Sequence, residues 1–114
     1  MTMIQGKCWG STKSLLSNKA LEFHEIQFKN GHRCSKHKHN TKFNLFYVIS
    51  GKLLIRVWKN AYDLVDETKL LPGQLTVVQP GEYHQFEALS DGVALELYWS
   101  EFDPNDIVRE TVGE

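Results

Sequence analysis

The sequence predicts a single all-β domain, a barrel or sandwich of short antiparallel strands that ends in one short helix. Apolar residues come in short runs that are rich in β-branched and aromatic side chains, as strands require. Turns that contain glycine or proline separate these runs at close intervals. The 114 residues are enough for one hydrophobic core, and no linker or internal repeat divides them, so we expect one domain over residues 1–114.

Six of these runs are predicted to be strands. In chain order they cover residues 21–28, 43–49, 52–58, 74–78, 84–88 and 93–99. The breaks fall at five glycines that follow Asn, Ser, Pro, Pro and Asp, pairs that supply the backbone angles of tight turns. These glycines are Gly31, Gly51, Gly73, Gly81 and Gly92.

The last predicted element is a short helix over residues 103–111. Asp103 is a suitable N-cap, Pro104 fits the first helical position, and Asp106 places a negative charge in the first turn. This helix would be the one exception to an otherwise all-β fold.

The composition is that of an ordinary soluble protein, with 41% hydrophobic and 24% charged residues. The net charge of −1 argues against a nucleic-acid partner. No apolar run approaches the roughly 20 residues that cross a bilayer, and the first residues lack the apolar core of a signal peptide, so we expect no membrane partner and a cytoplasmic location. Two cysteines, Cys8 and Cys34, are too few for a disulfide framework and are expected to be free.

Three histidines form the candidate site. His37 and His39 are two residues apart, so on a strand both imidazoles would point to one face. His84 begins another predicted strand. Imidazole nitrogen is a common ligand of divalent transition metals, which makes a metal site one interpretation. The alternative is a metal-free barrel in which the histidines hydrogen-bond with one another.

The spacing around these histidines resembles the two motifs of the cupin superfamily. The first motif is Gly31, five residues, His37, one, His39, four, Asn44, six, Gly51; the second is Gly73, six residues, Pro80-Gly81, two, His84. The resemblance implies a jelly-roll barrel, or double-stranded β-helix, with one divalent metal ion on His37, His39 and His84. It also implies that Asn44 stands where the family usually has a glutamate ligand, and Ala88 where it usually has asparagine.

Asn44 would change the character of such a centre. An asparagine can coordinate through its side-chain oxygen, but it is neutral, so the first shell would leave the metal charge uncompensated. We expect a stronger Lewis acid that favours an anion in its open position. The ligand set suits zinc, nickel, iron, manganese or copper, and the sequence does not select among them.

A narrower resemblance points to the compact cupins that are similar to mannose-6-phosphate isomerase. It is carried by residues 7–10, 31–39, 46–52 and 106–109. The resemblance implies a homodimer with a pocket for a small sugar or anionic ligand beside the metal. Glu96 is its candidate acid or base, and the candidate substrate-binding residues are Lys42, Arg109, Tyr98 and His24.

Three functions stay open at this point. The first is a metal-dependent isomerase or epimerase acting on a sugar or sugar phosphate, with Glu96 moving the proton and Lys42 and Arg109 holding the anionic group. The second is a non-catalytic cupin that binds a small sugar or anion, in which Asn44 marks lost activity. The third is a small iron-dependent cupin oxygenase.

Overall fold

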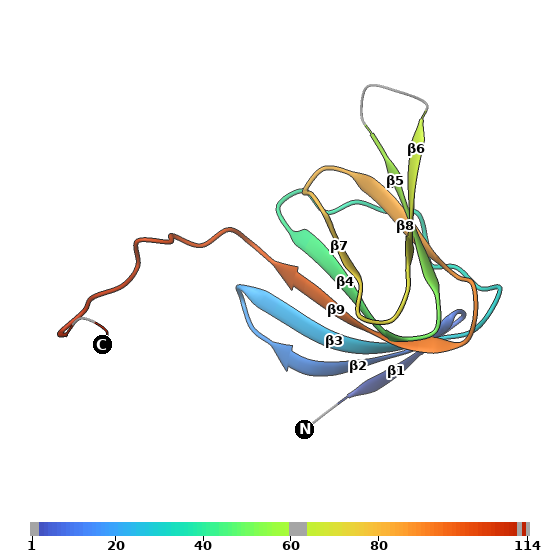
Figure 1. The fold of residues 1–114 in the computed structure, drawn as a ribbon, viewed down its shortest axis with the longest axis horizontal. Helices are drawn as coiled ribbons and strands as arrows, with labels where there is room; N and C mark the ends of the chain where they lie inside the picture. The colour runs from blue at the N-terminus through green and yellow to red at the C-terminus, as the bar shows by residue number, and fades with distance from the viewer. Residues whose placement is uncertain (1–2, 60–63, 112, 114) are drawn as a thin grey trace.

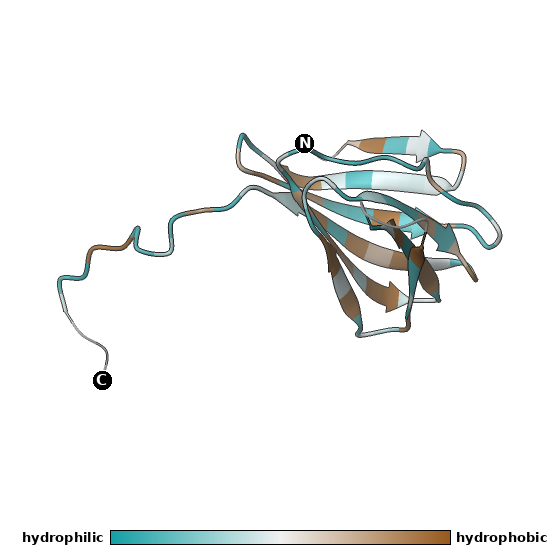
Figure 2. Cartoon of the chain, turned by 90° about the horizontal axis from the view of Figure 1, so that it is seen from above, coloured by the Kyte–Doolittle hydropathy of each residue, from teal (hydrophilic) through white to brown (hydrophobic). Residues whose placement is uncertain are grey.

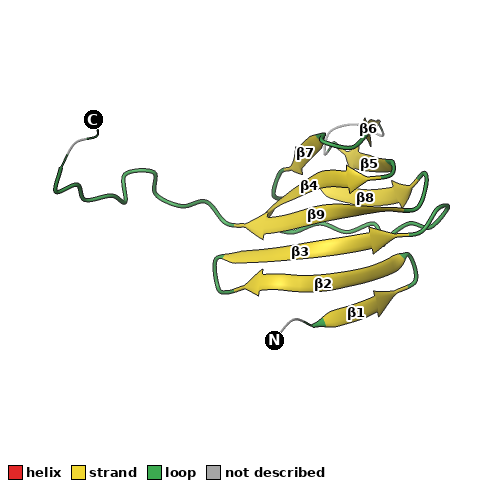
Figure 3. Cartoon of the chain, turned by 60° about the horizontal axis from the view of Figure 1, so that its bottom comes forward, coloured by secondary structure: helices red, strands yellow, loops and turns green. Residues whose placement is uncertain are grey.

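The computed structural model describes residues 3–59, 64–111 and 113 and arranges them in two antiparallel sheets (Figure 1). The strands are β1 (Ile4–Lys7), β2 (Gly10–Ser17), β3 (Leu21–Phe28), β4 (Phe43–Ser50), β5 (Leu53–Trp58), β6 (Val65–Leu70), β7 (Leu75–Val78), β8 (Tyr83–Ala88) and β9 (Gly92–Trp99). The larger sheet has the order β1-β2-β3-β9-β4-β7, and the smaller one has the order β6-β5-β8 (Figure 3). The all-β jelly-roll expectation is confirmed.

All six predicted strands are present, with ends that differ by at most one residue. The strands β1, β2 and β6 were not predicted. β1 and β6 are mostly exposed, β2 is exposed only at its end, and all three are rich in polar residues, so they lack the alternation that marks a half-buried strand. They form because each pairs with a neighbour along its whole length, which no local pattern reveals.

The predicted C-terminal helix is wrong, because residues 101–111 form an exposed tail without helix. Asp103 does cap a turn, accepting a hydrogen bond from the Asn105 backbone N–H at 2.9 Å. The turn does not continue because an isolated helix of this length is marginal in water and the tail packs on nothing. Its apolar residues Phe102 and Val108 are 79% and 99% exposed, and the tail runs away from both sheets (Figure 2). No helix in the described part of the chain could span a bilayer.

The hydrophobic core lies between the two sheets. The large sheet contributes Ile26, Phe46 and Val48, and the small sheet contributes Leu53 and Ile55, all at most 1% exposed. Burial of such side chains stabilises a fold by roughly 1.5–3 kcal/mol each. This packing holds the two sheets together and sets the distance between their inner faces.

Gly51 shows why one turn glycine is required. Its φ is +80°, and a Cβ added there would lie 2.3 Å from the backbone oxygen of Asp91. Both the backbone angle and the close approach therefore exclude a side chain. The predicted turn positions Gly31, Gly73 and Gly81 also have positive φ, as tight turns need.

The outer face of the large sheet is apolar. Strand register places one unbroken row across five strands: Leu16, Phe23, Leu97, Leu45 and Val77. A second row on the same face contains Leu95, Tyr47 and Leu75 and ends in the charged residues Glu25 and Lys13 on β3 and β2. An antiparallel sheet with one face in water usually carries polar residues there. We call these two rows the outer apolar face.

Candidate metal centre

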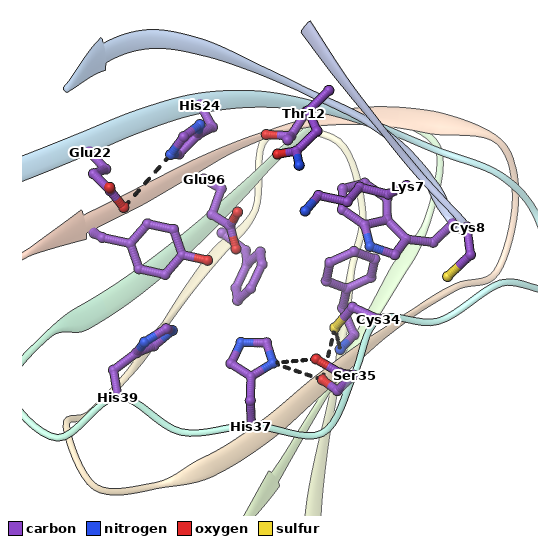
Figure 4. A pocket seen from close by; sticks show the side chains of 15 residues that line it. Lys7, Cys8, Thr12, Glu22, His24, Cys34, Ser35, His37, His39 and Glu96 are labelled. Atoms are coloured by element: carbon purple, nitrogen blue, oxygen red, sulfur yellow. Dashed lines mark hydrogen bonds and ion pairs between the residues drawn. The ribbon is translucent and has the colours of Figure 1, made fainter. Parts of the chain in front are cut away.

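The three histidines meet because the segment before β4 runs along β8. His37 and His84 exchange two backbone hydrogen bonds, of 3.0 and 2.8 Å. The N–H of Cys34 donates to the oxygen of Phe86 at 3.1 Å, and that of Gly81 donates to the oxygen of His39 at 2.7 Å. His37 and His39 therefore lie on an extended but irregular segment, not on a regular strand as expected. Their side chains still point into the same space (Figure 4).

The imidazoles form a compact group. Ring centroids are 4.6 Å apart for His37 and His84, 5.2 Å for His37 and His39, and 5.5 Å for His39 and His84. One nitrogen atom of each lies within 4.8 Å of the others, which is a spacing that could hold a metal ion. The structure thus brings together the three histidines that the sequence singled out.

Backbone carbonyls fix the orientation of two rings. The Nδ1 atom of His84 is 3.0 Å from the oxygen of Glu82, and that of His37 is 2.9 Å from the oxygen of Ser35. A carbonyl can only accept, so each Nδ1 carries the proton and each Nε2 keeps a lone pair. The Nε2 of His39 is buried, and no described residue forms a hydrogen bond with it. Lone pairs oriented by such bonds are what a metal site requires, so these residues fit a divalent cation.

Asn44 completes the group. Its side chain is 1% exposed, and its Oδ1 lies 3.1 Å from the Nε2 of His84. Because Nδ1 of His84 holds the proton, both of these atoms are lone-pair acceptors and repel each other. A cation in contact with both would remove the repulsion, as would rotation of the amide so that Nδ2 faces the ring. Asn44 is therefore placed to be a fourth ligand.

Two of the three histidines favour the neutral form in the absence of metal. The pKa of His39 is lowered from 6.5 to about 4, chiefly by burial and also by charge repulsion from His37 and His84. Burial also lowers the pKa of His84, partly offset by its hydrogen bond to Glu82. Neutral imidazole is the form that binds metals.

A buried acid lies next to Asn44. Glu96 is 8% exposed, and its Oε2 accepts a hydrogen bond of 3.4 Å from Nδ2 of Asn44. Burial raises the pKa of Glu96 to about 7, against the lowering effect of hydrogen bonds from Tyr98 and Asn44. Burial, with the nearby Glu96, also raises the pKa of Tyr98 above its usual range, so Tyr98 stays a hydrogen-bond donor. A carboxyl group with a pKa near 7 can both take and release a proton at neutral pH.

His37, His39, Glu96 and Tyr98 line a cavity of about 480 Å³, within the usual range for small-molecule sites (Figure 4). The cavity is continuous with the core. Along a strand that borders both, the inward-facing residues are polar at the cavity end and apolar at the core end. On β3, for example, His24 faces the cavity and Ile26 faces the core; on β9, Glu96 and Ala94 do the same. Cys34 also lines the cavity, but burial raises its pKa to about 11, so its thiol stays protonated at neutral pH.

The predicted ligand-binding residues divide into three cases. His24 and Tyr98 line the cavity. Lys42 is not among the cavity residues; it lies outside, 4.0 Å from Glu22 and 5.9 Å from the Tyr98 ring. The structure does not bring Arg109 to the site, because the expected helix is absent and Arg109 lies in the exposed tail.

The structure also adds polar residues that the sequence did not indicate. Gln5, Lys7, Thr12 and Glu22 line the same cavity. The first three come from β1 and β2, which were not predicted to be strands. No local sequence signal marks them, and only the pairing of β1 with β2 places them there.

Comparisons with known proteins agree with this geometry. The family model described as Cupin domain matches residues 24–101 of the 114. A search of the curated proteins finds no significant match.

Several solved structures are similar in fold. The capsular polysaccharide assembling protein CapF from Staphylococcus aureus superposes with a TM-score of 0.78 at 23% identity over 93% of this chain, which spans only 30% of CapF. KdgF from Halomonas sp. matches with a TM-score of 0.73 at 19% identity, over 88% of this chain and 89% of KdgF. The oxalate decarboxylase of Bacillus subtilis, described with Mn(II) centres, matches with a TM-score of 0.77 at 17% identity, over 92% of this chain and 29% of the enzyme. At these identities the likeness concerns the fold.

The lowered histidine pKa values predict how the metal-free protein responds to acid. Between pH 6.5 and about 4 the unfolded chain protonates His39 whereas the folded chain does not, so stability should fall as pH falls through this range. We expect His39→Asn to flatten this dependence, measured by urea unfolding at several pH values in the presence of a chelator. His32→Asn, at an exposed position, is the control and should keep the wild-type slope. An unchanged slope in His39→Asn would contradict the assignment.

Proposed function

The chain belongs to the cupin domain family, and on that premise we propose that it binds one divalent metal ion and acts on a small sugar or sugar phosphate as an isomerase or epimerase. His37, His39, His84 and Asn44 would hold the metal. The observation that carries the proposal is that His37, His39 and Glu96 line one cavity, with the buried Asn44 contacting both His84 and Glu96.

The chemistry follows from the residues that face the cavity. A bound metal would polarise the substrate carbonyl and make the neighbouring C–H more acidic. Glu96, as carboxylate, accepts the proton from this carbon and returns it to the adjacent carbon on the same face. Tyr98 donates a hydrogen bond to Glu96 and keeps it oriented. Its pKa near 7 allows Glu96 to work in both directions at neutral pH.

One observation favours a second function, binding without catalysis. All four candidate metal ligands would coordinate in a neutral form, since Asn44 supplies an amide and imidazole binds metals unprotonated. A centre without a carboxylate retains the full metal charge and can hold an anion tightly. Tight binding of an anion would suit a binding protein as well as an enzyme. Exchange of a substrate hydrogen with solvent distinguishes these two functions.

The first prediction from this proposal concerns the metal. Protein made without an affinity tag should bind close to one metal ion per chain after reconstitution with zinc, nickel, manganese, copper or iron(II). His84→Ala should weaken binding by at least about a hundredfold, because it removes an oriented ligand. His32→Ala should bind as the wild type does. Calorimetry and elemental analysis measure this, circular dichroism checks the fold, and stoichiometric binding by His84→Ala would refute the site.

The second prediction concerns the reaction. Metal-loaded protein in D₂O should exchange the hydrogen next to the carbonyl of fructose 6-phosphate, mannose 6-phosphate or glucose 6-phosphate, as followed by proton NMR. Glu96→Gln should slow exchange at least about a hundredfold, the usual contribution of a positioned base. Glu25→Gln, on the outer face of β3, is the matched control. If no substrate exchanges with any of the five metals, binding without catalysis is the better interpretation; oxygen uptake with iron(II) would instead indicate an oxygenase.

We also propose that two copies pair through the outer apolar face. The two rows cross five strands about 4.8 Å apart and occupy about 13 Å along them, so they present on the order of 300 Å² in plan, enough for the apolar centre of a standard interface of roughly 800 Å² of accessible surface per partner. The same face on each copy can meet across a two-fold axis, which is the commonest form of pairing.

Substitution in the central row tests this pairing. Leu45→Glu should convert the dimer to a monomer in sedimentation velocity, because it places a charge at the centre of the buried face. Leu54→Glu, on the outward side of β5 in the small sheet, should remain dimeric. A wild-type chain that sediments as a monomer, or a dimeric Leu45→Glu variant, would contradict the proposal.

A further inference from the structure

We propose that Lys7 forms an anion subsite of the cavity, so that the ligand carries a carboxylate or phosphate at the end remote from the histidines. This inference deepens the proposed function. It rests on that function only for the end of the ligand that would contact the metal. The subsite replaces the role that the sequence assigned to Lys42 and Arg109, neither of which lines the cavity.

Strand pairing turns Lys7 toward the cavity. In the hairpin of β1 and β2, Gln5 lies opposite Thr12, and Lys7 lies opposite Gly10. Thr12 is in turn opposite Ile26, a core residue, so Thr12 is on the inner face. Gln5 and Lys7 are two apart on one strand and share this face. All three line the cavity.

Contacts of the residues just after Lys7 anchor the hairpin of β1 and β2. Trp9 is 8% exposed, packs edge-to-face on Phe86 at 4.8 Å, and accepts a backbone hydrogen bond of 2.9 Å from Lys29. Gly10 has no room for a side chain, because a Cβ there would overlap the backbone oxygen of Gln27. These contacts hold the chain against β3 and thereby position Lys7 as part of the wall.

Lys7 lies across the cavity from His37, with Thr12 near it, and His24 lies farther along the wall next to Glu22 (Figure 4). The wall offers an ammonium, the Gln5 amide, the Thr12 hydroxyl and an imidazole. The Nδ1 atom of His24 is buried and has no hydrogen-bond partner among the described residues. Convergent donors around one cation are the chemistry that recognises a carboxylate or a phosphate.

Protein carboxylates do not satisfy Lys7. Among the described residues, the ion pairs shorter than 4.0 Å do not include it, and Glu22 is shared by His24 and Lys42. Glu96 is the other acid on the wall, and its burial favours the protonated form. A metal on neutral ligands at the far end would add a second positive charge, and a ligand with oxygen donors at one end and an anionic group at the other would match both.

Three probes with the same polyol chain test the subsite: sorbitol, gluconate and sorbitol 6-phosphate. They are neutral, a carboxylate and a phosphate, and none carries a carbonyl that could react. Binding to the full chain is measured by calorimetry with and without zinc, for the wild type, Lys7→Gln and the control Lys13→Gln. Lys13 faces the outer side of β2 opposite Glu25.

We expect wild-type protein to bind gluconate or sorbitol 6-phosphate at least about tenfold more tightly than sorbitol, a difference that one charged contact can supply. The tighter anion identifies the group that Lys7 receives. Lys7→Gln should lose this preference while keeping its affinity for sorbitol and zinc, and Lys13→Gln should keep all three. Failure to bind zinc would refute only the metal proposal, because the subsite can be tested in zinc-free protein. There the anion preference can be measured by calorimetry, and ligand-induced shifts of the backbone amide signals of Gln5 and Thr12 can be measured by NMR. Equal affinity for all three probes, or a preference retained in Lys7→Gln, would overturn the subsite.

Discussion

The candidate site depends on the pair of backbone hydrogen bonds between His37 and His84. Segment 33–39 has little regular structure of its own, and these bonds hold it in register with β8. The same pairing brings three imidazoles within reach of one metal ion, with His84 already oriented by the carbonyl of Glu82. Because β8 also carries Phe86 and Ala88 into the core, the site takes its rigidity from the core packing.

Asn44 connects two chemical functions that would otherwise be separate. Its oxygen faces His84 and its amide nitrogen faces Glu96, so a change on one side alters the hydrogen bonding on the other. A glutamate at this position would bring a second carboxyl group beside Glu96, and two close carboxylates resist joint ionisation. The neutral amide avoids this repulsion, which gives a physical reason why Asn44 and a buried Glu96 occur together.

The sequence was sufficient where the pattern is local. Histidine spacing and turn glycines such as Gly51 predicted the metal group and the strand boundaries, because period-two alternation and positive φ follow from the chain itself. It was insufficient for Lys7, which lies on an exposed edge strand whose position is set by pairing with β2. The prediction that Arg109 binds the ligand was wrong for the opposite reason. The capping pattern at Asp103 was real, but capping alone does not stabilise a helix without a packing surface.

The change from polar to apolar residues along the inward faces divides the interior into two regions that share the same strands. On β9, Ala94 belongs to the region that sustains the fold, and Glu96, two residues away, belongs to the region that lines the cavity; Ile26 and His24 divide β3 in the same way. Substitutions at Glu96 and His24 therefore act first on the cavity. Such a barrel is a scaffold whose specificity can diversify, by natural selection or by design, without a matching loss of stability.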